Sequence, residues 1–584
     1  MLVQYKKLIY PLILFYCLFS FLSSCSKSNK QDDSVKSGGS HSNNSDDQET
    51  LISEDEAFMI TNEEDPDSPA LDQNYEKGRK NTISRFDGLN IEFAFDKVNY
   101  AGEIKKISNI KGMKKLDKDH HVFNFSVNIG KYCFDPVENP DDCVNEYSDV
   151  LATYNHQSKK LEVIYPLSSS ASTIAAFEVL DGNVYFYSNL DYVGNQDEYD
   201  MNSELVLYSW KKGETARPLI VNSKSISGKK YYVHKNGSLN DPPYIVKLDG
   251  KIYFYAWVYD KPNQEYIYGQ AGRTVEYDPI SGTGEILDYS IFIENIRERG
   301  NTLTSLYNGN LLGFDPKNKT FFSLNYFSNQ ALNIENNNIN SFSKNKFFIQ
   351  AIGYNSKDSD FIHFYSYSHL DKNLDLLGTF NCPYDPSIPG GSHLGICQNK
   401  YQTENFIIIN DQKLIFSMPI PTILNSDDYK VPRPFKTFIV EKNKPIVEAP
   451  HINELNLDKT KNKYLILGDF KFSDNQEKEI LIYDTEKKLT QNEDFFLAYN
   501  PTLNNLKKIK MDKGNCDFSK HENVNYDDII HTTNNNKINV KEHVYFSLYS
   551  KAISVEFKTN YFFQFKNNKE IKCISDKFNG GFIK

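Results

Sequence analysis

Cysteine is the residue type with the clearest chemistry in this sequence. The chain contains eight cysteines, of which Cys17 and Cys25 lie near the N-terminus and the others in the body. An even number of cysteines in the body indicates disulfides where a chain is exported. Proximity along the sequence favours Cys133 with Cys143 and Cys382 with Cys397, and this leaves Cys516 with Cys573 as the third pair. A zinc site would need close pairs such as Cys-x-x-Cys, which the sequence lacks.

Other residues with catalytic side chains are present but form no recognised motif. The sequence has no G-x-S-x-G, H-E-x-x-H or Walker loop. Ser392 and His393 are adjacent, whereas a catalytic pair is assembled from distant segments, so we interpret them as part of a turn. We expect His120 and His121 at the start of a strand, with one ring packed and the other facing solvent. One acidic cluster lacks the order of an EF-hand and is interpreted as a solvated loop: Asp191, Asp197, Glu198 and Asp200. We therefore assign no catalytic residue, no metal and no cofactor.

The N-terminus has the features of an export signal. Two lysines precede the apolar run 8–22, which has the length of a signal-peptide core and is short for a membrane span. The tetrapeptide Leu-Ser-Ser-Cys then ends at Cys25. This stretch resembles the lipobox of bacterial lipoprotein precursors, in which the signal is cut before a cysteine whose thiol carries a lipid. The resemblance implies a signal peptide over 1–24 and lipidation of Cys25, with an ordinary secretory signal or a signal anchor as the alternative.

The residue after the cysteine bears on the destination of such a lipoprotein. Many enteric lipoproteins carry Asp at this position when they stay at the inner membrane, and this chain has Ser26. The resemblance therefore favours attachment to the outer membrane, with the body either in the periplasm or exposed at the cell surface.

Residues 25–88 have the composition of a tether. Acidic side chains outnumber basic ones in this stretch, which carries most of the formal net charge of −11. Runs of Ser, Gly, Asn and Asp bury too little apolar surface to offset the entropy of ordering, so we predict a disordered linker. The body, 89–584, is then close to neutral and has no basic run, which argues against nucleic acid as a partner.

The body has the repeat pattern of an all-β protein. The chain contains 39 Tyr and 40 Phe, mostly in short runs with β-branched residues rather than at helical spacing. A strand of alternating aromatic and aliphatic residues recurs, and each copy is followed by two further strands. These recurring strands begin at residues 121, 183, 251, 302, 346, 413, 463 and 543. Twice the preceding turn is Leu-Asp-Gly, at 180–182 and 248–250.

These units resemble the blades of bacterial periplasmic β-propellers. Runs at 173–180 and 242–248 supply an additional inner strand, which makes a four-stranded meander per repeat. We predict a β-propeller of seven or eight four-stranded blades, with irregularity in the seventh because 494–506 offers a competing strand. Departures from known propeller families are the lack of a Trp-Asp signature and of repeated Asp-boxes. Stacked β-sandwiches are the structural alternative.

The long connections suggest where the propeller binds. Loops between second and third strands and between blades open on one face, and the predicted disulfides Cys133–Cys143 and Cys382–Cys397 fall within them. Loops that are rigidified and rich in Tyr and Pro suit a recognition surface. The sequence therefore predicts a non-enzymatic lipoprotein that binds a protein or glycan. A propeller hydrolase or lyase is the alternative, for which carboxylates, or a histidine and a carboxylate, should converge at the propeller axis.

Overall fold

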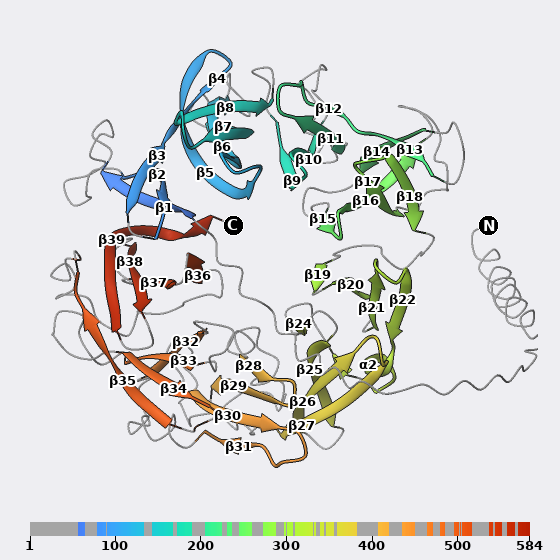
Figure 1. Ribbon diagram of the computed structural model, residues 1–584, viewed down its shortest axis with the longest axis vertical. Coiled ribbons are helices and arrows are strands. Elements are labelled where there is room, and N and C mark those ends of the chain that lie inside the picture. Colours follow the sequence, from blue (N-terminus) through green and yellow to red (C-terminus); the bar gives the residue numbers. More distant parts are fainter. Residues whose placement is uncertain are drawn as a thin grey trace, which may run out of the picture. The chain divides into compact units, whose positions relative to one another are not determined.

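The computed structural model describes most of the chain from residue 56 to residue 583. The longer gaps in that description are 65–78, 134–142, 190–204, 236–243, 260–272, 288–296, 382–406, 420–434, 450–463, 471–478, 485–495, 517–536 and 552–557, and shorter gaps separate some neighbouring strands. Residues 48–584 form one compact unit. Within it, eight sheets of mostly four antiparallel strands form an eight-bladed β-propeller (Figure 1), which confirms the predicted fold class.

The first four blades follow one another along the chain. Blade one contains β4 (Lys97–Tyr100), β5 (Glu103–Lys115), β6 (His120–Cys133), β7 (Cys143–Asn155) and β8 (Lys160–Tyr165). Blade two contains β9 (Ile174–Leu180), β10 (Asn183–Asn189), β11 (Leu205–Lys211) and β12 (Arg217–Pro218). Blade three contains β15 (Ile245–Leu248), β16 (Lys251–Tyr259), β17 (Arg273–Asp278) and β18 (Thr283–Leu287). Blade four contains β19 (Arg297–Arg299), β20 (Thr302–Tyr307), β21 (Asn310–Asp315) and β22 (Thr320–Leu324).

The remaining four blades continue in the same order. Blade five contains β23 (Leu332–Asn333), β24 (Ile339–Ser343), β25 (Lys346–Asn355), β26 (Ser359–Ser368) and β27 (Asn373–Asn381). Blade six contains β28 (Ile407–Asn410), β29 (Lys413–Pro419), β30 (Phe435–Glu441) and β31 (Val447–Glu448). Blade seven contains β32 (Tyr464–Phe470), β33 (Glu479–Asp484), β34 (Phe496–Asn500) and β35 (Asn505–Asp512). Blade eight contains β36 (Lys537–Val540), β37 (His543–Lys551), β38 (Lys558–Lys566) and β39 (Glu570–Ile583).

Blade seven explains the irregularity expected from the sequence. The competing segment forms β34, which is the third strand of this blade, so β35 becomes the fourth. The recurring aromatic strand is third in the sheet of blade one, where β4 precedes β5, and second in the other repeats, whereas β32 is the edge strand among the described residues of blade seven. The repeat is therefore shifted by one strand in this blade.

Three N-terminal strands complete the ring. They are β1 (Ala57–Glu64), β2 (Arg79–Phe86) and β3 (Ile91–Phe95). β1 pairs antiparallel with β39, from the opposite end of the chain, with Phe58 opposite Ile583. The predicted linker over 25–88 is therefore wrong for the part that forms β1 and β2. The prediction used the average composition of 25–88, which does not show the short apolar run Ala57–Ile60. Side chains of this run alternate between two buried faces.

Consecutive blades are held together by apolar cores. Each core takes buried side chains from two neighbouring blades, and burying one large apolar side chain contributes about 1.5–3 kcal/mol. In order around the ring, these seams include Leu151 with Phe186, Tyr187 with Val275, Tyr253 with Phe314, Phe322 with Phe347, Phe364 with Phe416, Ile415 with Ile480, and Phe496 with Phe563.

The last seam, which we call the closure seam, contains the N-terminal strands. Ala57 and Met59 of β1 pack with Tyr545 and Phe562 of blade eight. Phe58 packs on the other side with the core of blade one. Side chains of a strand alternate between its two faces, so one short strand seals two blades against each other.

The two ends of the propeller differ in their connections. At one end, which we call the turn end, first and second strands and third and fourth strands are joined by short turns such as 316–319 and 369–372. Asp181–Gly182 and Asp249–Gly250 have positive φ at both residues, as a two-residue hairpin turn requires. At the opposite loop end the connections include 190–204, 260–272, 382–406 and 420–434, all outside the described residues.

An additional hairpin that the sequence analysis did not foresee bridges blades two and three. β13 (Ile220–Ser223) pairs with β14 (Lys230–Lys235) and runs parallel to β18. β14 also pairs with β11 and β16, so the two blades share one hydrogen-bonded sheet.

Helix is scarce in the described part of the chain. The single described helix, α2 (Tyr326–Asn329), is one turn that follows blade four. Among the residues with described structure, no helix has the length and apolar character needed to cross a membrane.

Candidate functional site

Adjacent histidines at the start of β6 face opposite sides of blade one. β6 pairs with β7 so that His121 lies opposite Tyr154 and His120 opposite Asn155. Both histidines are buried: His121 has 3% and His120 has 8% of its surface exposed. The expectation that one ring faces solvent was therefore wrong, because each face of this blade is covered, one by the N-terminal strands and the other by blade two.

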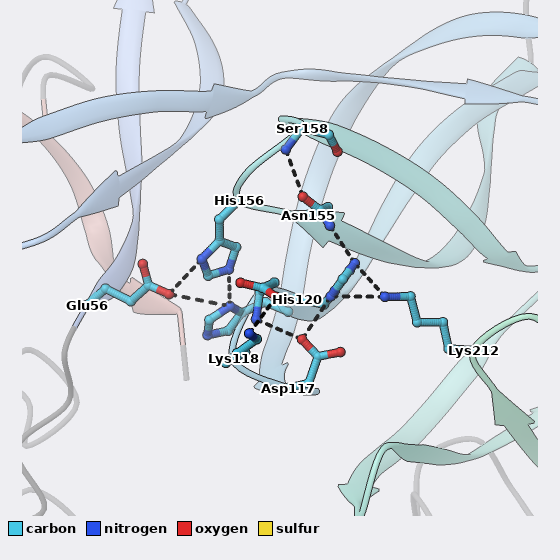
Figure 2. A network of polar contacts seen from close by, with 10 residues as sticks. Glu56, Asp117, Lys118, His120, Asn155, His156, Ser158 and Lys212 are labelled. Carbon is cyan, nitrogen blue, oxygen red and sulfur yellow. Dashed lines mark hydrogen bonds and ion pairs between the residues drawn. The ribbon is translucent and has the colours of Figure 1, made fainter.

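His121 belongs to a buried group of metal-binding residue types at the closure seam, which we call the closure cluster: Glu56, His121 and His156. Glu56 lies just before β1, and His156 follows the last residue of β7. His156 Nδ1 lies 2.9 Å from Glu56 Oε1, and His156 Nε2 lies 2.6 Å from His121 Nδ1. Figure 2 shows the side chains of Glu56 and His156 pointing towards each other from separate strands. The three residues form a hydrogen-bonded chain in which His156 is central.

Charge around the cluster keeps Glu56 ionised. Arg85 of β2 donates from Nε to Glu56 Oε2, and a guanidinium nitrogen of Arg85 lies 3.9 Å from Glu92. Burial alone would raise the pKa of Glu56, but hydrogen bonds with His156 and Arg85 outweigh it and lower the pKa to about 2. Burial and the nearby His156 lower the pKa of His121 to about 3. The closure cluster thus contains a carboxylate anion beside the neutral imidazole of His121.

Aromatic rings pack against the histidines of the closure cluster. Phe58 lies 4.8 Å from the His121 ring and 5.7 Å from the His156 ring, measured between centroids. The Tyr154 ring stacks on His156 at 5.9 Å. The two histidine rings themselves stack at 4.7 Å. This packing fixes the orientation of both imidazoles.

His120 belongs to a second network on the opposite face. Its Nδ1 lies 2.8 Å from Asp117 Oδ1, and its Nε2 lies 2.6 Å from Asn155 Nδ2. Lys212, from the turn after β11 in blade two, lies 3.0 Å from the same Nε2 (Figure 2). The His120 network therefore ties blade two to blade one at the turn end.

Similar polar contacts recur at other seams on the turn end. Each joins a side chain in a turn to a residue of the preceding blade: Lys319 to Glu276, His369 to Asp315 at 3.4 Å, and Lys442 to Asp375 at 2.9 Å. Glu276 also accepts hydrogen bonds from Lys251 and from Tyr253, whose hydroxyl lies 2.8 Å away. Burial would raise the pKa of Glu276, but the bonds from Lys251, Lys319 and Tyr253 lower it below its ordinary value.

Charged side chains also meet on the innermost strands of blades one to four, which Figure 1 shows around the centre of the ring. We call this group the axial cluster: Lys114 of β5, Glu178 of β9, Lys247 of β15 and Glu298 of β19. Glu178 lies 3.2 Å from Lys114 and 3.4 Å from Lys247. The side chain of Glu298 is exposed overall, yet the protein atoms around its carboxyl group, and then the negative charge of Glu178, raise its pKa. Two carboxylates with different environments thus lie on innermost strands of blades two and four.

The structure places the predicted cysteines as follows. Cys516 and Cys573 form a disulfide that links the end of blade seven to blade eight. Cys133 and Cys143 are backbone register partners across β6 and β7, and their side chains lie outside the description. Cys25, Cys382 and Cys397 lie outside the described residues, as do Ser392, His393 and the acidic cluster at 191–200.

Sequence reasoning missed both clusters. The alternation His121, Phe123, Phe125 is a readable signal that His121 faces the core. Nothing in the sequence places Glu56 beside it, because their proximity depends on the pairing of β1 with β39. Glu178 and Glu298 likewise come from different blades.

Comparison with known proteins yields similarity in fold alone. No family model matches the chain, and no curated protein matches it. Solved structures that align include dipeptidyl peptidase 4 of Porphyromonas gingivalis, at 8% identity and a TM-score of 0.30, over 62% of this chain and 56% of that chain. Oligogalacturonate lyase of Vibrio parahaemolyticus aligns at 11% identity and a TM-score of 0.24, over 62% of this chain and 72% of that one.

A bacterial extracellular domain also aligns. It belongs to a protein assigned as a one-component system of B. thetaiotaomicron and matches at 10% identity and a TM-score of 0.20, over 91% of this chain and 74% of that one. The present chain spans little more than half the length of the dipeptidyl peptidase. None of these similarities carries an argument about function.

Proposed function

We propose that this protein is a lipid-anchored recognition protein of the bacterial cell envelope, attached to the outer membrane through Cys25. The Leu-Ser-Ser-Cys sequence after a signal-like apolar run supports the anchor. Residues 26–55 would then form the tether. As a flexible chain of that length, they would have a typical end-to-end distance of about 30 Å, enough to hold the propeller away from the lipid surface.

The observation that carries the binding role is the difference between the two ends of the propeller. The turn end is closed by short turns and by ion pairs between blades. The loop end carries the long connections of blades one, two, three and six and the 382–406 segment between blades five and six. Binding residues are commonly located on loops that a rigid scaffold positions. We therefore propose that the loop end binds a protein or a glycan of the envelope.

The anchor is tested by metabolic labelling of growing cells with a lipid precursor. Cys25→Ala should abolish labelling of this protein, because no thiol remains at the cleavage site. Cys17→Ala is the matched control and should label like the wild type. Labelling that persists in Cys25→Ala would refute the lipidated anchor.

The binding face is tested by photocrosslinking in intact cells. A photoreactive amino acid replaces Tyr266 or Tyr429 in the loop-end connections, or the exposed Ile280 or Leu370 in turn-end turns. We expect specific adducts from the first pair and none from the second. Adducts confined to the turn end, or absent from every position, would refute the proposed face.

A second candidate function follows from the axial cluster. Glycan hydrolysis commonly uses two carboxyl groups in different protonation states, one as acid and one as base or nucleophile. Glu298, with its raised pKa, and the ion-paired Glu178 are suited to those two roles. The substrate would be an envelope polysaccharide that enters along the axis.

This second candidate is tested by incubating the purified protein with envelope polysaccharides and measuring new reducing ends or unsaturated products. Glu298→Gln should abolish any cleavage. Glu285→Gln, an exposed carboxylate of β18 paired with Lys224 at 3.5 Å, is the matched control and should cleave like the wild type. Cleavage that survives Glu298→Gln would exclude this role for the axial cluster.

A further inference from the structure

The closure cluster joins two segments of the chain, the residue before β1 and the β6–β7 hairpin of blade one. Glu56 comes from the N-terminal side of β1, whereas His121 and His156 come from the β6–β7 hairpin of blade one. We propose that Glu56, His121 and His156 bind one divalent transition-metal ion, with Zn²⁺ as the ion to test, and that this ion fastens the N-terminal strands to blade one. This inference is independent of the proposed binding role.

The donor atoms are spaced closely enough for one ion. One ligand atom from each residue can be chosen so that all three lie within 4.8 Å of one another. Tetrahedral zinc with bonds of about 2.0–2.1 Å places its ligand atoms about 3.3 Å apart. Glu56 Oε1 lies 2.9 Å from His156 Nδ1 and 3.9 Å from His121 Nδ1, distances on either side of that value. For these three atoms to bind one ion, His121 Nδ1 would have to turn away from its 2.6 Å contact with His156 Nε2.

The types of donor select the class of metal. Two imidazoles and one carboxylate suit zinc and its transition-metal neighbours, whereas calcium and magnesium prefer oxygen ligands alone. Three protein ligands leave one position of a tetrahedral ion for water. The described surroundings offer no thiol to the cluster, so a copper(I) or iron–sulfur type of site is not favoured.

The groups behind the donors have the character of a supporting shell. Arg85 holds Glu56 Oε2, which leaves Oε1 directed at the histidines. The backbone N–H of His156 donates to the carbonyl of Asp119 at 2.9 Å, which fixes the segment that carries this ligand. Phe58 and Tyr154 restrict the two rings from the apolar side. Such outer contacts orient metal ligands and strengthen binding.

A metal-free role is the competing explanation. The hydrogen-bonded chain from Glu56 through His156 to His121 satisfies these polar groups without an ion. Metal content separates the two explanations, because the hydrogen-bonded chain predicts no bound zinc.

The experiment uses the mature full-length chain, purified with a tag that contains no histidine, stripped with chelator and dialysed against Zn²⁺ at micromolar concentration. We expect about one zinc per chain by elemental analysis, and a Co²⁺-substituted form with visible absorption of a four-coordinate site. His156→Ala, His121→Ala and Glu56→Gln should each weaken binding by about tenfold or more. His363→Ala is the matched control, since His363 lies on β26 and contacts Thr379 at 2.7 Å, away from the cluster.

Two results would overturn the proposal. One is a folded wild-type protein that retains no stoichiometric zinc, a result that requires no variant. The other is zinc that remains bound with wild-type affinity in Glu56→Gln, whose amide preserves the size of the side chain. Circular dichroism of each variant shows whether it is folded. If a histidine variant is unfolded, its zinc affinity is left out of the comparison, and Glu56→Gln alone is compared with the wild type.

Discussion

The closure seam and the seam between blades three and four each pack two neighbouring parts of the ring together, but they use different polar side chains. Both have an apolar core, formed by Phe58 with blade one in the first and by Tyr253 with Phe314 in the second. Both bury a glutamate beside that core. Glu276 is paired with two lysines and a tyrosine, whereas Glu56 is paired with Arg85 and two histidines.

This difference relates to how each seam is connected. Blades three and four are consecutive in the chain, so a lysine from the next turn suffices to link them. The closure seam joins β1 to β39, which come from opposite ends of the chain. No short turn of the backbone links these two strands. Histidines can bind a metal as well as donate hydrogen bonds, whereas protonated lysines donate hydrogen bonds but have no lone pair for a metal. Of these two seams, only the closure seam has the residue types with which a bound metal ion could strengthen the contact between strands.

The largest expected effect comes from removing an apolar side chain from each seam. Phe58→Ala and Phe314→Ala should each lower the free energy of unfolding by about 3–5 kcal/mol, because both rings are buried and leave a cavity. Urea unfolding followed by tryptophan fluorescence measures both. If Phe58→Ala cost less than about 1 kcal/mol while Phe314→Ala cost the full amount, the closure seam would not seal the ring.

The next effect concerns the buried glutamate of the regular seam. Glu276→Gln should lower the free energy of unfolding by about 2 kcal/mol, since a hydrogen bond to a charged group contributes about 1.5–3 kcal/mol. Glu285→Gln, on the neighbouring strand but exposed, should change it by less than about 0.5 kcal/mol. Equal effects of the two substitutions would show that burial does not strengthen the Glu276 contacts.

The same glutamate predicts a pH dependence. The pKa of Glu276 is lowered in the folded state from an ordinary value of 4.5, so its contribution is present above pH 4.5 and is lost as the pH falls through the folded value. The stability difference between wild type and Glu276→Gln should therefore be constant from pH 7 to pH 5.5 and shrink below pH 4.5. Unfolding midpoints measured across this range test the prediction, and a difference that grew on acidification would contradict it.

The smallest effect is expected at a solvent-exposed seam contact. Lys442 and Asp375 lie 2.9 Å apart between blades six and five, with about a third of each side chain exposed. Lys442→Met should change the free energy of unfolding by less than about 1 kcal/mol, because water and salt screen such pairs. A thermal-shift assay at low and high salt measures this change in stability. If Lys442→Met lowered the stability as much as Glu276→Gln does, buried and exposed contacts would not differ in strength.

Local pattern was sufficient to predict the strands and most of the blades. Alternation in 183–188 and 251–256 identifies β10 and β16, and Leu-Asp-Gly identifies the turns before them. The same reasoning was wrong for β1 and β2, because a short apolar run inside a long acidic stretch is lost when composition is averaged. Strand β1 is stabilised by β39 and blade one, and neither is local to it.

The sequence by itself determined the β class, a repeat of seven or eight blades and the features of an export signal, because strand periodicity, turn chemistry and signal composition depend on neighbouring residues. Only the tertiary structure decided that Glu56 meets His121 and His156, and that Glu178 meets Lys114 and Lys247 on the innermost strands. These groups come from separate strands, and their proximity follows from the closure of the ring and the packing of one blade on the next.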